Sequence, residues 1–68
     1  MGSQKKLGKN IRIARNKTKL TQQQVAEAVD LHTNFYARVE RGEETPSMKT
    51  LKTICKVLNV KSSDILDF

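Results

Sequence analysis

The sequence predicts an all-α fold, a compact domain of five short helices. Apolar residues recur three and four positions apart along most of the chain, which is the period of a buried helix face. Ser and Thr stand where such helices would begin. Val, Ile and Thr never alternate with polar residues over a strand length, and no Asn-Gly or Asp-Gly hairpin turn occurs. At 68 residues, the chain can bury one modest core.

The first helix is expected from Lys5 to Lys17, after a flexible N-terminus over residues 1–4. A single domain then covers residues 5–68. The apolar stripe of this helix has the spacing i, i+4, i+7 and consists of Leu7, Ile11 and Ala14. Residues 18–20 form the turn that follows.

A second helix of two turns is expected to begin at Thr21 and to end near Val29. The stretch TQQQ fits a capping box, in which the Thr21 hydroxyl accepts from the Gln24 amide and the Gln24 side chain reaches back. The inner face consists of Val25, Ala26 and Val29. Asp30 follows, and Asp is one of the few residues besides Gly that enter the left-handed region at a small penalty. A tight turn is therefore feasible there.

The third helix is expected from Thr33 to Arg41, with Gly42 as a left-handed stop. Its inward residues are Tyr36, Val39 and Glu40. Neighbouring side chains on a helix point about 100° apart, so only one of two adjacent aromatics can face the core. We expect Tyr36 to point inward and Phe35 to lie on the flank.

A loop and two further helices complete the chain. Pro46 keeps Thr45 out of the α region, and Ser47 is a good N-cap for a helix over residues 48–58. The inner stripe of this fourth helix is Leu51, Ile54, Cys55 and Leu58. Ser62 is expected to cap a short fifth helix.

Charge and rare residues limit the function classes. The net charge is +6, and residues 1–19 hold seven basic residues and no acidic one, which suggests a polyanionic partner. One Cys and one His leave nothing for a catalytic triad or a metal site, so no enzyme, cofactor or small-molecule ligand is expected. Cys55 reads as a small buried hydrophobe rather than a reactive thiol. No apolar run approaches the length of a membrane span, and a lone Cys fits a reducing cytoplasm.

The stretch LTQQQVAEAVDLHTNFYARVERGEETPS resembles the Cro/cI-type (XRE) helix-turn-helix family of bacterial and phage transcription regulators. Upstream, IRIAR matches that family's IRxxR, and downstream, LKTICKVLNV matches its L..IA.AL.V. The resemblance spans roughly residues 7–66. It implies a lambda-repressor-like domain whose second and third helices form the helix-turn-helix, and a sequence-specific regulator of double-stranded DNA, more often a repressor.

In such proteins the second helix of the motif lies in the major groove. Thr33 and Asn34 match the family's main base-reading positions, and Arg38 follows Asn34 by one helical turn. Asn pairs with adenine, Arg with guanine, and Thr can contact a thymine methyl group. Without the family pattern, these side chains would be an ordinary solvated face. Phe35 has two readings, a thymine-methyl contact or packing on the flank.

Candidate phosphate contacts are Gln22, His32, Arg41, Lys17 and Lys19. Gln22 begins the second helix and supplies a side-chain donor. His32 stands where the family has a Ser or Thr cap, and imidazole caps less well than a hydroxyl. It is therefore either a phosphate contact or a plain loop residue. The family also joins an arginine to a glutamate by a partly buried ion pair, here Arg15 and Glu40.

Because one domain reads few base pairs, a homodimer on an inverted repeat is expected. The candidate dimer surface is the fifth helix with the final residues ILDF. The alternative for these residues is a frayed chain end. The alternative function is a protein-interaction module of the same fold, such as an antitoxin or a bridging cofactor.

Overall fold

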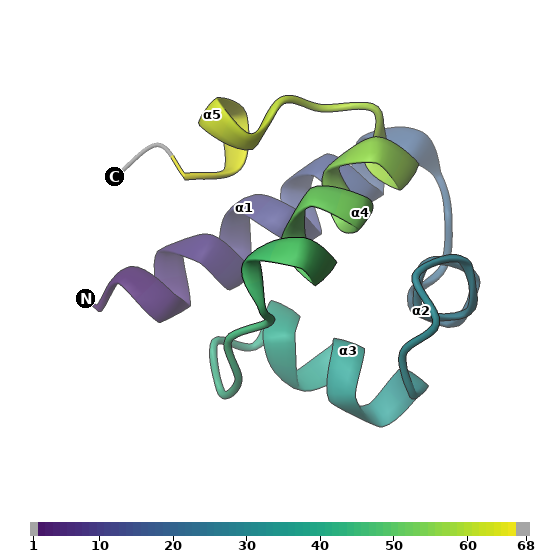
Figure 1. Cartoon of the computed structure of the whole chain (residues 1–68), viewed down its shortest axis with the longest axis horizontal. Coiled ribbons are helices and arrows are strands. Elements are labelled where there is room, and N and C mark those ends of the chain that lie inside the picture. Colours follow the sequence, from purple (N-terminus) through teal and green to yellow (C-terminus); the bar gives the residue numbers. More distant parts are fainter. Residues whose placement is uncertain (1, 67–68) are drawn as a thin grey trace.

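A computed structural model describes residues 2–66, and the predicted five-helix all-α fold is confirmed. The helices are α1 (Ser3–Thr18), α2 (Gln22–Ala28), α3 (Thr33–Glu40), α4 (Met48–Leu58) and α5 (Ser62–Ile65). In Figure 1, α3 runs along the lower edge and α2 is seen end-on beside it. Helix α3 packs on α1 and α2, while α5 packs on α1 and α4. No helix within the described residues is long and apolar enough to span a membrane.

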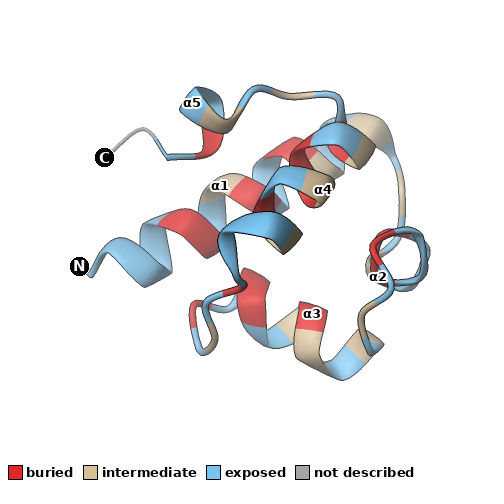
Figure 2. Cartoon of the chain, in the orientation of Figure 1, coloured by how far each residue is buried: buried red, intermediate tan, exposed pale blue. Residues whose placement is uncertain are grey.

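The predicted inner faces form one core. Buried residues line the inward side of each helix (Figure 2), and the largest fully buried side chains include Tyr36, Ile11, Ile54 and Leu58. Cys55 is buried in the same cluster. Tyr36 is fully buried and Phe35 packs on the margin of the core, so the two adjacent aromatics divide as expected. The core therefore fixes one side of α3 and leaves its other side to solvent.

One predicted helix cap and two predicted turns have the expected geometry. Thr21 and Gln24 make both hydrogen bonds of a capping box at the start of α2, at 3.0 and 2.8 Å. Asp30 ends the α2 turn in the left-handed region, with φ 59°. Gly42 does the same after α3, with φ 77°. These turns set the direction in which α3 enters and leaves.

Helix α1 begins at Ser3 rather than at Lys5, so the expectation that residues 3 and 4 precede the helix is wrong. Gln4 Nε2 donates to the Gly42 carbonyl oxygen at 2.6 Å, and the Thr45 hydroxyl donates to Gln4 Oε1 at 2.8 Å. This amide joins the start of α1 to the loop after α3. Such a contact depends on residues far apart in the chain, so the local apolar pattern carried no sign of it.

The expected cap of α5 is also wrong. Lys61, not Ser62, is the residue before the helix, and Ser62 is the first helical residue. The Asp64 carboxylate accepts from the Lys61 amide at 3.1 Å and so stabilises this end of the helix. A carboxylate in the first turn of a helix also interacts favourably with the helix dipole.

Gly8 allows α1 to approach the end of α3 closely. A Cβ atom at this position would lie against the Val39 carbonyl oxygen and 2.6 Å from the Glu40 carbonyl oxygen. Because both obstacles are backbone atoms, they could not move without shifting α3. Glycine in the middle of a helix is unfavourable, and here it is the residue that lets the two helix backbones meet.

Candidate nucleic-acid interface

The outward face of α3 carries the three candidate base-reading residues. Asn34 and Arg38 are exposed, and Thr33 is partly exposed. The opposite face is held by Tyr36 and Val39, which are almost completely buried. After Arg38, the helix closes with two hydrogen bonds, from the Gly42 and Glu43 amides to the Val39 and Arg38 carbonyl oxygens, at 3.1 and 2.9 Å. This is a Schellman arrangement. The structure thus places the three side chains together on a rigid surface.

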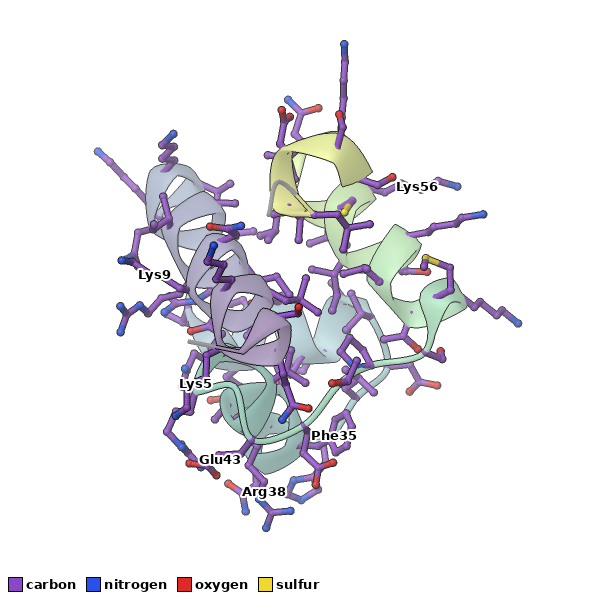
Figure 3. The ribbon with its side chains drawn as sticks, turned by 90° about the vertical axis from the view of Figure 1, so that its left-hand side faces the viewer. Lys5, Lys9, Phe35, Arg38, Glu43 and Lys56 are labelled. Atoms are coloured by element: carbon purple, nitrogen blue, oxygen red, sulfur yellow. The ribbon has the colours of Figure 1, made fainter. Side chains whose placement is uncertain are left out.

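Phe35 is half-buried and packs against the edge of the core. In Figure 3 it lies beside Arg38 at the lower end of the molecule. In the free protein, Phe35 therefore packs on the flank of α3, which is one of the two roles predicted for it. An aromatic ring held in this way also restricts the position of the helix relative to the core.

His32 is the N-cap of α3, and its reading as a plain loop residue is wrong. Its Nδ1 accepts a hydrogen bond from the Asn34 amide at 3.1 Å. Because Nδ1 accepts, Nε2 is the ring nitrogen that can donate. The ring is exposed, which leaves that N–H available to an acceptor outside the protein. Sequence reasoning missed the cap because a histidine caps a helix less often than a hydroxyl or carboxylate does.

Arg15 and Glu40 form a bidentate ion pair between α1 and the end of α3. Arg15 Nε donates to Glu40 Oε2 at 2.6 Å, and Nη2 donates to Oε1 at 3.1 Å. The Arg15 side chain is 14% exposed and the Glu40 side chain 1%. Gln22 Nε2 also donates to Glu40 Oε1, at 3.0 Å. One carboxylate therefore joins the first three helices.

The surroundings of Glu40 favour its charged form. Burial by itself would raise the pKa of the carboxyl group, but hydrogen bonds from Arg15 and Gln22 and the Arg15 charge outweigh burial and lower it. Burial, with the Glu40 carboxylate nearby, raises the pKa of Tyr36 well above its usual value. The Tyr36 hydroxyl is buried and has no hydrogen-bond partner among the described residues. It adds an apolar ring to the core and stays neutral.

The lowered pKa of Glu40 predicts acid sensitivity. A carboxyl group whose pKa is lower in the folded protein stabilises the fold above its unfolded pKa, about 4.5, and this contribution is lost as the pH falls further. Thermal unfolding followed by circular dichroism from neutral to acidic pH should show a steep loss of stability below about pH 4.5. Glu40→Gln should be less stable at neutral pH but lose less on acidification. Parallel pH profiles for the two proteins would contradict the assignment.

Arg41 is already bound to a carboxylate in the free protein. Its Nε donates to Glu43 Oε2 at 2.9 Å, and both side chains are more than half exposed. The Arg41 guanidinium, with smaller contributions from Arg38 and Lys5, lowers the pKa of Glu43. By itself, the Glu43 carboxylate would repel phosphate. The structure instead places it as the partner of a residue expected to bind phosphate.

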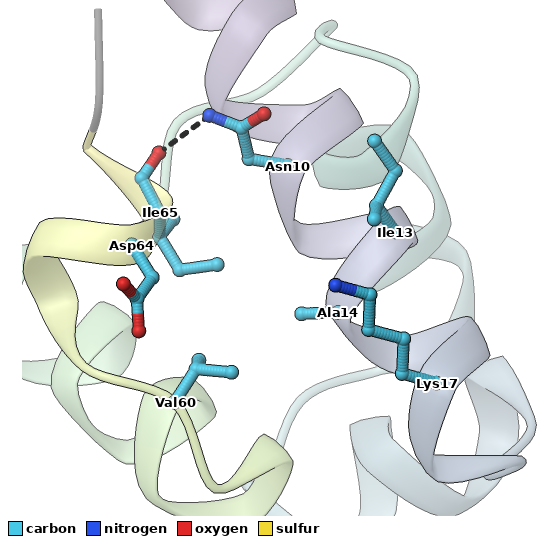
Figure 4. Close-up of a pocket in the computed structure, with 7 residues that line it drawn as sticks. All are labelled: Asn10, Ile13, Ala14, Lys17, Val60, Asp64 and Ile65. Carbon is cyan, nitrogen blue, oxygen red and sulfur yellow. Dashed lines mark hydrogen bonds between the residues drawn. The ribbon is translucent and has the colours of Figure 1, made fainter.

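The two candidate lysines lie apart from each other. Lys19 ends α1 in the left-handed region, φ 65°, two residues before Thr21, where the capping box of α2 begins. Lys17 lines a groove between α1 and α5, with Val60 and Asp64 on its other wall (Figure 4). The structure therefore keeps Lys19 near the start of the helix-turn-helix and turns Lys17 towards α5.

The one cysteine and the one histidine of the chain both occupy structural positions. Cys55 is buried, and burial raises the pKa of its thiol, which keeps it protonated at neutral pH. The only histidine is engaged in the cap of α3. Within residues 2–66, no three His, Cys, Asp or Glu side chains are grouped so that they could hold a metal ion.

Comparison with known proteins agrees with this geometry. A helix-turn-helix family profile matches residues 11–65. The control protein C.BamHI of Bacillus amyloliquefaciens is 34% identical over 62 residues, which cover 90% of this chain and 76% of that protein. The control protein C.SmaI of Serratia marcescens is 37% identical over 60 residues, which cover 88% of this chain and 71% of that protein. The immunity repressor protein of Bacillus phage phi105 is 35% identical, and the chain covers 42% of its length.

Solved structures show the same fold. The clp gene regulator ClgR from C. glutamicum superposes with a TM-score of 0.94 at 25% identity, over 98% of this chain and 86% of that one. The restriction-modification controller protein C.AhdI from Aeromonas hydrophila has a TM-score of 0.84 at 23% identity, over 90% and 92%. With the profile match and the relatives above, these likenesses confirm the resemblance seen in the sequence. The chain belongs to the XRE-type helix-turn-helix family of DNA-binding transcriptional regulators.

Proposed function

We propose that this protein reads a specific sequence in double-stranded DNA by placing α3 in the major groove. The observation that carries the proposal is the outward face of α3, where Thr33, Asn34 and Arg38 share one side of a helix held on the other side by the core. A rigid helix of this kind fits the major groove, with its N-terminal residues at the base edges. Such a protein binds rather than catalyses, and it works in the cytoplasm.

The three side chains suggest which bases are read. Asn34 can bind adenine through N6 and N7, and Arg38 can bind guanine through O6 and N7. Thr33 can donate to a base or contact a thymine methyl group. Because Asn34 and Arg38 are one helical turn apart, about 6 Å along the axis, they would contact base pairs about two steps apart.

Three residues near the helix starts are proposed to bind the DNA backbone. Gln22 is the first residue of α2, His32 caps α3, and Lys19 lies at the end of α1, just before α2. Gln22 uses one amide N–H for Glu40 and keeps a second for a phosphate oxygen. His32 has its Nε2–H free on the surface. Phe35 can add a thymine-methyl contact through its exposed edge. Contacts to phosphate fix the position of the protein but carry no sequence information.

Lys17 and Arg41 are the two remaining phosphate candidates. Lys17 lines the groove between α1 and α5, so it is the weaker of the pair. Arg41 would have to exchange its Glu43 partner for a phosphate.

A second copy of the chain is the proposed partner on DNA. Leu66 and Met48 are exposed apolar residues, 37% and 57% accessible, and both line a groove of about 380 Å³ with Leu7 and Pro46. Joining these grooves across a two-fold axis would cover apolar surface that water otherwise meets. The expected dimer surface at α5 and ILDF is thus extended to the start of α4. Asp67 and Phe68 lie outside the described residues.

Selection from random duplexes tests the proposed function. We expect the protein to enrich an inverted repeat whose half-sites are about 34 Å apart, and to bind the selected duplex as two copies. Given the immunity repressor among its relatives, we expect binding to reduce transcription when the site overlaps a promoter. If no motif is enriched, the protein is better described as an interaction module. A single copy on the selected duplex would contradict the dimer.

A further inference from the structure

A basic groove lies between α1 and the C-terminal end of α3. It has a volume of about 400 Å³ and is lined by Lys5, Lys9, Arg12, Glu40, Arg41 and Glu43. The charge of residues 1–19 predicted a polyanionic partner, but Lys5, Lys9 and Arg12 were not among the predicted phosphate contacts. Their positions have the spacing i, i+4, i+7, which aligns them along one side of α1.

The groove keeps a strong positive charge. Glu40 is buried and is already matched by Arg15, which lies outside the groove. Glu43 is therefore the one exposed carboxylate among four cationic side chains, a net charge of +3. A concave surface with one sign of charge concentrates ions of the opposite sign. The groove is thus suited to an anion.

The groove is held firmly against the end of α3. The backbone of Lys5 lies directly on Gly42, where an added Cβ would come within 2.8 Å of the Lys5 Cα. Gln4 reinforces the same junction through its bond to the Gly42 carbonyl oxygen. The cations of α1 are consequently fixed relative to the helix that we propose to read the bases.

The groove also opens on the same side as the base-reading face. In Figure 3, Lys9, Lys5, Glu43 and Arg38 follow one edge of the molecule in that order, whereas Lys56 projects from the other side. A duplex in contact with Arg38 would therefore continue past the groove. From Lys5 to Arg12 the helix rises about 10 Å, so its three cations can lie along neighbouring phosphates of one strand.

We propose that this groove binds the DNA backbone beside the base pairs read by α3, and that a phosphate replaces Glu43 at Arg41. Arg41 offers a forked donor that suits either a carboxylate or a phosphate, and the lysines act as point charges that do not require one geometry. Glu43 then keeps Arg41 in place in the free protein and weakens binding to DNA. The proposal rests on the DNA-binding function but not on its sequence specificity.

The test compares two triple variants, Lys5→Ala/Lys9→Ala/Arg12→Ala in the groove and Lys49→Ala/Lys52→Ala/Lys56→Ala on α4. All six side chains are exposed, and both variants remove three positive charges. Binding is measured over a range of salt concentrations on the selected duplex and on a random one. Each phosphate contact contributes about 0.9 to the slope of log K against log salt. In the groove variant, the magnitude of this slope should be about 2 to 3 smaller than in wild type on both duplexes. In the α4 variant it should decrease much less.

Equal slopes for the two triple variants would overturn the proposal. If wild type preferred no sequence, the proposed specificity would fail, but the slopes on random DNA would still test the groove. Glu43→Gln should bind both duplexes several-fold more tightly; unchanged or weaker binding would overturn the exchange at Arg41. Inorganic pyrophosphate provides the last arm. If it displaced DNA at micromolar concentration, the groove would serve a small phosphorylated ligand instead of the backbone.

Discussion

Glu40→Ala is expected to lower the free energy of unfolding by about 3 kcal/mol, near the lower end of the range for breaking a buried ion pair. The substitution leaves the largely buried Arg15 guanidinium without a carboxylate, and it removes the hydrogen-bond acceptor of Gln22. Arg15 retains one contact, from Nη1 to the Leu20 carbonyl oxygen at 2.9 Å, and is 14% exposed, so water can compensate for part of the loss. Chemical and thermal denaturation measure the change.

The chain offers a matched control for this experiment. Glu43 forms an ion pair of similar geometry with Arg41, but both side chains are more than half exposed. Water and salt screen such a pair, so Glu43→Ala should leave the melting temperature almost unchanged. Adding Arg15→Ala to Glu40→Ala should recover some stability because the unpaired cation is then absent. Equal melting temperatures for Glu40→Ala and Glu43→Ala would contradict the structural role of the buried pair.

Arg38→Ala should weaken binding to the selected duplex by about 10- to 100-fold, since a bidentate contact to guanine contributes about 1–3 kcal/mol of discrimination. Arg38 is exposed, so its removal should not disturb the fold. Binding to random DNA should fall only by the amount that one lost charge explains. Fluorescence anisotropy with both duplexes measures the ratio of the affinity for the selected duplex to the affinity for random DNA.

Arg41→Ala is the comparison for Arg38→Ala, because we assign Arg41 to phosphate rather than to a base. It removes the same charge from the same helix end, but it should weaken binding to both duplexes by similar factors. A fall in specificity for Arg41→Ala, with none for Arg38→Ala, would reverse the two assignments.

Local signals in the sequence predicted much of the fold. The capping box at Thr21, the left-handed turns at Asp30 and Gly42 and the inner face of α3 depend on residues close together in the chain. Their geometry follows from short-range sterics and helical period, which a sequence displays directly. The same signals placed the base-reading candidates on one exposed face.

Contacts between distant segments could not be predicted in this way. Gln4 extends α1 because it meets Gly42, 38 positions away, and Gly8 is required because α3 crosses it there. A lone glycine in a helical pattern was the available sign of such a close approach. The Arg41–Glu43 ion pair, on which the proposed exchange with phosphate rests, is similarly invisible in the sequence, since it depends on which neighbouring charges the fold brings together.

The central claim is that the outward face of α3 determines which DNA sequence the protein binds. Its most direct test measures the affinity of wild type, Asn34→Ala and Arg38→Ala for duplexes in which each base pair of the selected half-site is changed in turn. We expect each variant to become indifferent to the base at one position and to keep the wild-type preference at the others. Variants that bind every duplex more weakly by the same factor, with all preferences intact, would contradict the claim.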